Sequence, residues 1–312
     1  MESQSPPLPP IERRRIRANG LEFAIAVSES QPRGGQLALC LHGFPECWRS
    51  WIHQFSLLSE LGYRVWAPDL RGYGGTDKPK GVERYAIENL VADVGGLIDA
   101  SGARSTFLMG HDWGAIVAWI FAIRRTRELD RLAILNVPHP ALIRENATWR
   151  QPLRSWYIAF FQIPWLPEKV LALRDASSIA RVFTSSATHP DRFPEPVLQV
   201  YRDAALQPGA LTAMLNYYRA LVRGGQARQA RLGFPVVDVP TLMLWGENDV
   251  ALGIELTHGT DRYVSDLTLR YLPGISHWVQ QDDPETVNAM LEAWLQGRVV
   301  PEKTSLASMS AE

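Results

Sequence analysis

The stretch from residue 107 to residue 123 restricts the possible folds of this chain more than any other. The apolar run 107–109 predicts the end of a buried strand, and the apolar segment 115–123 predicts a buried helix. Between them, Gly110 and Gly114 stand two residues before and two residues after Asp112. This is the spacing of G-x-S-x-G, a sharp strand-to-helix turn that exposes its central side chain, here with Asp in place of Ser. The stretch therefore predicts a strand, a tight turn and a helix, with Asp112 at the apex.

The remaining sequence predicts an α/β fold. Short apolar runs alternate with helical patterns, and the runs with strand character cover residues 36–41, 63–67, 131–137, 241–245 and 267–272. This alternation indicates a mostly parallel sheet with helices on both faces. Ligands of such sheets bind beyond the carboxyl ends of the strands, where we expect Phe44, Asp112, Asp249 and His277 to lie.

One long segment departs from this alternation. Residues 141–234 contain helical patterns rich in aromatic residues and no run with strand character. We expect this segment to form a helical cap domain inserted into a core domain of residues 15–140 and 235–299. Residues 1–14 and 300–312 are polar or rich in small residues, so we expect them to be disordered tails.

Composition excludes several classes of function. The 312 residues carry a formal net charge of −1, which predicts no general attraction to nucleic acid or to an anionic membrane. Two cysteines without a metal-ligand spacing favour a reducing compartment and predict no metal site. No signal-peptide pattern is present, and the longest apolar run is too short to span a bilayer. We therefore expect a soluble cytoplasmic protein without membrane or nucleic-acid partners.

The order of three polar residues predicts a chemistry. Asp112, Asp249 and His277 follow the order nucleophile, acid, histidine of an α/β-hydrolase triad. A carboxylate is ionised at pH 7, so Asp112 can attack an sp³ carbon and form an ester with the enzyme. We expect His277, oriented by Asp249, to activate the water that hydrolyses this ester. The backbone N–H groups of Phe44 and Trp113 are expected to form the oxyanion hole.

Each of these residues also has a common structural role. An Asp between glycines is most often a turn former, and a histidine in a loop is a weak signal. Glu247 competes with Asp249 as the triad acid. The joint occurrence of all three in this order is what favours catalysis. Asp69 and Arg71, by contrast, are interpreted as a pair that stabilises a loop.

These motifs resemble those of α/β-hydrolase-fold epoxide hydrolases, over about residues 15–296. The motifs that carry the resemblance are His42-Gly43-Phe44-Pro45, Arg71-Gly72-Tyr73-Gly74, Gly110-His111-Asp112-Trp113-Gly114, and the matched Asp249 and His277. The resemblance implies an eight-stranded, mostly parallel sheet with a helical lid, and a cis Phe44–Pro45 peptide. It also implies that Tyr157 and Tyr218 of the lid hydrogen-bond the epoxide oxygen, and that Phe44, Trp113, Tyr157 and Tyr218 contact the substrate.

Haloalkane dehalogenases are the main alternative, because they share the Asp turn, the histidine and the tryptophan after the nucleophile. They usually carry a halide-binding Asn where Phe44 stands, and a phenyl ring cannot donate that hydrogen bond. A non-catalytic ligand-binding module is less favoured because every triad residue is present. The expected reaction needs no cofactor and acts on a small hydrophobic epoxide. The sequence leaves monomer and homodimer both open.

Overall fold

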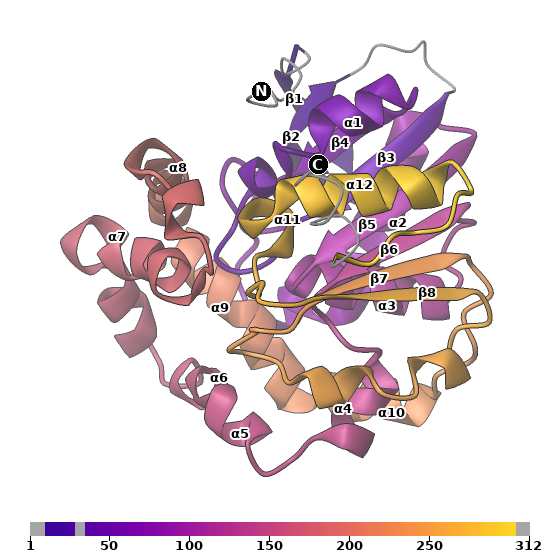
Figure 1. The fold of residues 1–312 in the computed structure, drawn as a ribbon. Coiled ribbons are helices and arrows are strands. Elements are labelled where there is room, and N and C mark those ends of the chain that lie inside the picture. The colour runs from indigo at the N-terminus through magenta and orange to yellow at the C-terminus, as the bar shows by residue number, and fades with distance from the viewer. Residues whose placement is uncertain (1–9, 29–34, 304–312) are drawn as a thin grey trace.

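An eight-stranded sheet forms the centre of the protein in a computed structural model that describes residues 10–28 and 35–303 (Figure 1). Its strands are β1 (Glu12–Ala18), β2 (Leu21–Ser28), β3 (Gln36–Leu41), β4 (Arg64–Pro68), β5 (Ser105–His111), β6 (Arg131–Leu135), β7 (Thr241–Gly246) and β8 (Leu267–Leu272). Their order across the sheet is β1-β2-β4-β3-β5-β6-β7-β8. The pairs β1–β2 and β2–β4 are antiparallel, and all other neighbours are parallel. The mostly parallel α/β sheet expected from the sequence is confirmed.

The parallel strands are buried because helices cover both faces of the sheet. The core helices are α1 (Phe55–Glu60), α2 (Ile87–Ser101), α3 (Trp113–Ile123), α11 (Val279–Asp282) and α12 (Pro284–Leu295). Alternate residues of a strand point to opposite faces, so Leu39 packs in a cluster with α2 and α3 while Cys40 packs in a second cluster with α1 and α12. This explains why β3 is a continuous apolar run instead of an alternating one.

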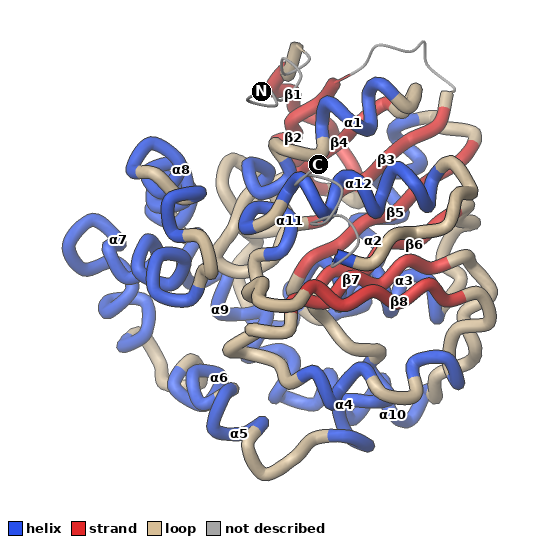
Figure 2. The backbone as a smooth tube through the Cα atoms, in the orientation of Figure 1, coloured by secondary structure: helices blue, strands red, loops and turns tan. Residues whose placement is uncertain are grey.

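Between β6 and β7 the described chain forms helices and no strand. These helices are α4 (Pro140–Asn146), α5 (Gln151–Arg154), α6 (Trp156–Phe160), α7 (Leu166–Ser186), α8 (Glu195–Leu206), α9 (Ala210–Ala220) and α10 (Gln226–Leu232). α7 is interrupted at residues 173–176, and a π-helical turn (Leu221–Gly225) joins α9 to α10. Figure 2 shows these blue helices gathered beside the red sheet, so the insertion forms a helical lid. None of the described helices is long and apolar enough to cross a bilayer.

The expected tails are too long at both ends. Residues 12–14, assigned to the N-terminal tail, belong to β1, where Glu12 pairs with Val27 and Arg14 with Ile25. Their charged side chains suggested disorder, but an edge strand exposes such side chains to solvent. At the other end, Val300 is buried and its carbonyl accepts two hydrogen bonds from Arg270. Residues 1–9 and 304–312 of the expected tails lie outside the described residues.

Candidate active site

Asp112 occupies the sharp turn between β5 and α3. Its backbone has φ 46° and ψ −120°, a strained conformation for a residue with a side chain. The flanking glycines allow the strand and helix to approach closely: a Cβ at Gly110 would lie 2.6 Å from the carbonyl of Gly114, and one at Gly114 would lie 2.1 Å from the carbonyl oxygen of Leu41. The turn predicted from the glycine spacing is confirmed.

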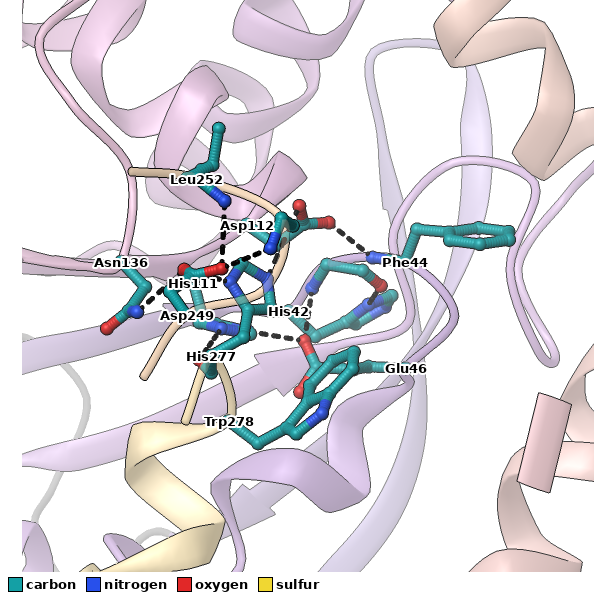
Figure 3. Close-up of polar contacts among 12 residues, drawn as sticks. His42, Phe44, Glu46, His111, Asp112, Asn136, Asp249, Leu252, His277 and Trp278 are labelled. Atoms are coloured by element: carbon teal, nitrogen blue, oxygen red, sulfur yellow. Dashed lines mark hydrogen bonds and ion pairs between the residues drawn. The ribbon is translucent and has the colours of Figure 1, made fainter. Parts of the chain in front are cut away.

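The loop after β3 contacts the Asp112 carboxylate directly. The backbone N–H of Phe44 donates a 2.7 Å hydrogen bond to Oδ1 of Asp112, and the Phe44–Pro45 peptide is cis (Figure 3). A Cβ at Gly43 would lie 2.3 Å from the Cβ of Asp112, so only glycine fits beneath the carboxylate. Trp113 begins α3, whose first N–H groups lack partners within the helix. The amides of Phe44 and Trp113 thus both adjoin Asp112.

His277 and Asp249 come together from the loops after β8 and β7. Nδ1 of His277 lies 2.6 Å from Oδ2 of Asp249, and both residues are buried. The other carboxylate oxygen accepts hydrogen bonds of 2.7 and 2.9 Å from the backbone N–H groups of Ala251 and Leu252. Asp249 is therefore fixed on both sides (Figure 3). Glu247, the competing acid in the sequence, is exposed, and among the described residues His277 pairs with Asp249 and Asp112 and not with it.

His277 also faces Asp112. Its Nε2 atom lies 3.8 Å from Oδ2 of Asp112, which makes an ion pair when the imidazole is protonated. Burial lowers the pKa of His277, but the charges of Asp249 and Asp112 outweigh this and raise the pKa to about 10. Burial raises the pKa values of Asp112 and Asp249, but the imidazolium holds both below their usual range. At neutral pH the free site therefore contains two carboxylates around one cation.

Asn136, at the end of β6, supports the acid. Its Nδ2 donates to Oδ2 of Asp249 at 2.8 Å, and its Oδ1 accepts from the backbone N–H of Gly246 at 2.8 Å. Asn136 was not among the site residues predicted from the sequence. Its place at the end of a strand next to β7 was the available signal for this supporting contact.

Glu46 joins the loops on the two sides of the site, a role that the sequence does not reveal. Its Oε2 lies 2.8 Å from Nδ1 of His111 and accepts from the backbone N–H of Gly43 at 2.7 Å. The other ring nitrogen of His111 lies 2.8 Å from the carbonyl oxygen of His277. The His111 side chain thus points away from the cavity and connects Glu46 to the His277 loop (Figure 3). Glu46 is completely buried, and its position directly after His42-Gly43-Phe44-Pro45 in the sequence gave no sign of this.

A cavity of about 270 Å³ lies above Asp112 between the core and the cap helices. Asp112, Trp113, Tyr157 and Tyr218 all line it, and most other lining side chains are apolar. The rings of Tyr157 and Tyr218 are 5.9 Å apart and nearly perpendicular. Burial, and then the charge of Asp112, raise the pKa values of both phenols, so they remain protonated. The phenyl ring of Phe44 is not among the lining groups and packs on the ring of Tyr218 at 5.5 Å.

Neighbouring tyrosines on α9 have different surroundings. Tyr217 donates a 2.7 Å hydrogen bond to the carbonyl oxygen of Arg71, whereas the ring of Tyr218 contacts those of Tyr157 and Phe161. A rotation of about 100° per helical residue separates the two side chains. Tyr218 is therefore the member of the pair that faces Tyr157.

The expected pair of Asp69 and Arg71 is wrong. Arg71 forms a buried bidentate ion pair with Asp93 on α2, with distances of 2.6 and 2.7 Å. Asp69 instead pairs with Arg13 of β1 at 2.7 Å. Both partners come from distant segments, so proximity along the chain misled the prediction.

The described residues contain no group of three or more His, Cys, Asp or Glu side chains placed to hold a metal ion. Cys40 and Cys47 are buried and unpaired.

Comparisons with known proteins agree with this geometry. The family described as the alpha/beta hydrolase fold matches residues 38–284. The AB hydrolase superfamily protein YfhM of Bacillus subtilis (strain 168) is 36% identical over 285 residues, covering 91% of this chain and 97% of that protein. Epoxide hydrolase 4 of Homo sapiens is 39% identical over 290 residues, covering 90% of this chain and 77% of that protein.

Solved structures give the same grouping. An epoxide hydrolase of Bacillus megaterium in complex with an inhibitor superposes with a TM-score of 0.82 at 29% identity, covering 91% of this chain and 100% of that chain. Epoxide Hydrolase A of Mycobacterium thermoresistibile superposes with a TM-score of 0.78 at 30% identity, covering 94% of this chain and 100% of that chain. The chain belongs to the α/β-hydrolase fold family, in the group that contains the epoxide hydrolases.

Proposed function

We propose that this protein hydrolyses small hydrophobic epoxides to vicinal diols, through an ester formed on Asp112. The observation that carries the proposal is one cavity lined by the carboxylate of Asp112 and the phenols of Tyr157 and Tyr218. Tyr85 and Tyr217 also line it, but their hydroxyls donate to the backbone carbonyl oxygens of Pro79 and Arg71. A carboxylate supplies the nucleophile for an epoxide carbon, and phenols supply hydrogen bonds to the oxygen that leaves it. The largely apolar lining favours a hydrophobic substrate.

In the first step, Asp112 attacks an epoxide carbon. Its lowered pKa keeps the carboxylate ionised, and its position at the turn exposes it to the cavity. The raised pKa values of Tyr157 and Tyr218 keep the phenols protonated, so they donate to the ring oxygen as its C–O bond breaks. One phenol transfers its proton to this oxygen, which gives a hydroxyalkyl ester on Asp112 and a phenolate that takes up the proton released by His277 before the second step.

In the second step, His277 activates a water molecule that attacks the carbonyl carbon of the ester. Esterification removes the negative charge of Asp112, which is one of the causes that raise the pKa of His277. The imidazole therefore releases its proton more readily in the ester than in the free protein, and becomes a base when one is required. Asp249 keeps the ring oriented, and the N–H groups of Phe44 and Trp113 stabilise the oxyanion.

The two halves of the cavity come from two parts of the chain. We propose residues 12–140 and 235–300 as the core domain and residues 141–234 as the cap domain. Asp112 lines the cavity from the core side, while Tyr157 and Tyr218 line it from α6 and α9 of the insertion. The proposed reaction uses no metal or organic cofactor. The two unpaired cysteines favour a reducing, cytoplasmic location.

A competition between two electrophiles tests the proposal. The protein is offered a styrene-type epoxide and, separately, a primary bromoalkane, and the released diol or bromide is measured. We expect diol and no bromide, and no diol from the Asp112→Ala variant. Bromide release without diol would assign the protein to dehalogenation, and release of neither would support a non-catalytic binding module.

A further inference from the structure

The outer side of the cap has a concentration of exposed apolar side chains. Of the fourteen large hydrophobic side chains that are exposed in the described residues, eight lie between residues 149 and 173. We use the name cap apolar patch for six of them: Trp149, Leu153, Trp156, Ile163, Trp165 and Leu173. The three tryptophans are 74%, 66% and 64% exposed. Figure 1 shows α5, α6 and α7 at the periphery of the molecule, on the side away from the sheet.

The α5–α6 segment exposes apolar side chains to solvent as well as to the cavity. Leu153 lies on α5 and Trp156 on α6, while Trp149 and Ile163 lie in the turns just before α5 and just after α6. Tyr157 and Ile158 of the same segment line the cavity, and the site explains them. The four outward side chains are between 42% and 74% exposed, and a concentration of exposed apolar surface of this kind marks an interaction site.

The charges around the patch are unevenly paired. The three acidic residues of segment 141–175 each pair with a cation outside the segment, as Glu145–Arg262, Glu168–Arg219 and Asp175–Arg202. Four exposed basic residues of the segment form no ion pair with any described residue: Arg144, Arg150, Lys169 and Arg174. Two of them lie over tryptophans of the patch, Arg150 over Trp149 at 5.3 Å and Lys169 over Trp165 at 4.8 Å.

We propose that the cap apolar patch docks this protein on a lipid surface that carries anionic headgroups. Tryptophans favour the boundary between headgroups and acyl chains, and the surrounding cations favour anionic lipids. A second copy of the chain fits less well, because a two-fold interface would place the same unpaired cations opposite one another. The net charge of −1, which predicts no attraction to membranes, averages over this locally positive surface.

Docking in this orientation would place one wall of the cavity at the lipid surface, since the same α5–α6 segment carries Tyr157 and the exposed Trp156. An apolar epoxide concentrates in the lipid phase, so the cavity would open near its source. That benefit rests on the proposed function, whereas docking itself rests only on the surface.

Vesicle sedimentation tests the proposal. The full chain is mixed with vesicles of phosphatidylglycerol and phosphatidylcholine, or of phosphatidylcholine alone, at low and high salt. We expect binding to the anionic vesicles that weakens with salt, and little binding to the neutral ones. The double variant Trp149→Gln/Trp156→Gln and the double variant Arg150→Gln/Lys169→Gln should each bind at least about tenfold more weakly.

Matched variants elsewhere serve as controls. Val299→Gln removes an 89% exposed apolar side chain, and Lys80→Gln/Arg104→Gln removes two exposed cations, all outside the cap. Both should bind vesicles like the wild type. Thermal unfolding, and turnover of a water-soluble epoxide without vesicles, should be unchanged in all four variants. The vesicle measurement gives its answer whether or not the protein turns over an epoxide.

Three results would overturn the proposal. The first is no binding to anionic vesicles at any salt concentration. The second is binding that the patch variants and the control variants change equally. The third is dimerisation of the wild type that Trp149→Gln/Trp156→Gln abolishes, without vesicle binding, because the patch would then be an interface between two copies.

Discussion

Nε2 of His277 lies 3.8 Å from Oδ2 of Asp112, beyond hydrogen-bond distance but close enough for a strong interaction between buried charges. The ring therefore faces the carboxylate without bonding to it, while its other nitrogen is held by Asp249 at 2.6 Å. This arrangement separates the two proposed steps: Asp112 acts first with His277 charged, and His277 acts second once Asp112 has lost its charge.

Replacing the base should trap the ester. In His277→Gln, Asp112 can still attack the epoxide, but water is no longer activated, so steady-state turnover should fall by about 10² to 10⁴-fold. Intact-protein mass spectrometry should show an increase equal to the mass of the epoxide. Asp112→Ala is the control and should show no adduct. Absence of an adduct on His277→Gln under saturating epoxide would contradict the proposed order of events.

Neutralising Asp112 should lower the pKa of His277. The raised value of about 10 means that the imidazole keeps its proton from pH 6.5 up to about pH 10, where an ordinary histidine is neutral. Asp112→Asn mimics the uncharged ester and removes one source of this stabilisation. Titration of labelled histidine by NMR should therefore give a lower pKa in the variant. The change Asp99→Asn, in an exposed pair with Arg127, should leave it unaffected. An unchanged pKa in Asp112→Asn would mean that esterification does not switch the base on.

Removing both lid hydroxyls should block ring opening. In Tyr157→Phe/Tyr218→Phe the leaving oxygen loses both donors, and single-turnover ester formation should fall by about 10³-fold or more. Tyr217→Phe is the neighbouring control, because its hydroxyl bonds to the carbonyl oxygen of Arg71. It should reduce ring opening far less than Tyr218→Phe does. Rates near those of the wild type in the double variant would remove the tyrosines from the mechanism.

Asn136 should affect ester hydrolysis more than ester formation. Asn136→Ala leaves Asp249 with one fewer hydrogen bond and the N–H of Gly246 without its acceptor, at a cost of about 1–3 kcal/mol in the free energy of unfolding. A less firmly held Asp249 orients His277 less well, so only the second step should slow in single-turnover measurements. Asn288→Ala also loses two hydrogen bonds, but with Gln54 and His53 and not with a residue of the triad. If the two variants lose stability alike and Asn136→Ala hydrolyses the ester normally, Asn136 is only structural.

The Arg71–Asp93 pair should be a major determinant of stability. Both side chains are buried, so Arg71→Met leaves an uncompensated carboxylate and should lower the free energy of unfolding by about 3–5 kcal/mol. Arg71→Met/Asp93→Leu removes both charges and should recover much of that loss. Chemical denaturation of the three proteins measures both effects. A double variant as unstable as Arg71→Met would show that the pair's geometry matters more than its charges.

The meeting of Asp112, Asp249 and His277 could be predicted from the sequence because parallel strands end at one edge of a sheet. Asp112 follows β5, Asp249 follows β7 and His277 follows β8, and these strands lie close together in the sheet order. Apolar runs locate the strands, so residues just after them were expected to meet. The same reasoning could have predicted that Asn136 contacts Asp249, since Asn136 follows β6, which lies between β5 and β7.

Side-chain contacts between the sheet and the helices that cover it could not be predicted from the sequence. The partner of Arg71 is on α2, and which carboxylate reaches it depends on how that helix packs on the sheet. Burial of Glu46 likewise depends on Gln280 and Gln281, more than two hundred residues away. The aromatic residues of the cap indicated helices but not their exposure: Phe161 is buried against Tyr218, whereas Trp149 and Trp165 face solvent.

The glycine beneath Asp112 limits how the specificity of this protein can be changed. Any side chain at Gly43 would collide with Asp112 itself, so this position cannot be substituted without moving the Asp112 carboxylate. Directed evolution toward bulkier or more polar epoxides should therefore accumulate its substitutions among the residues that line the cavity, and leave Gly43 unchanged.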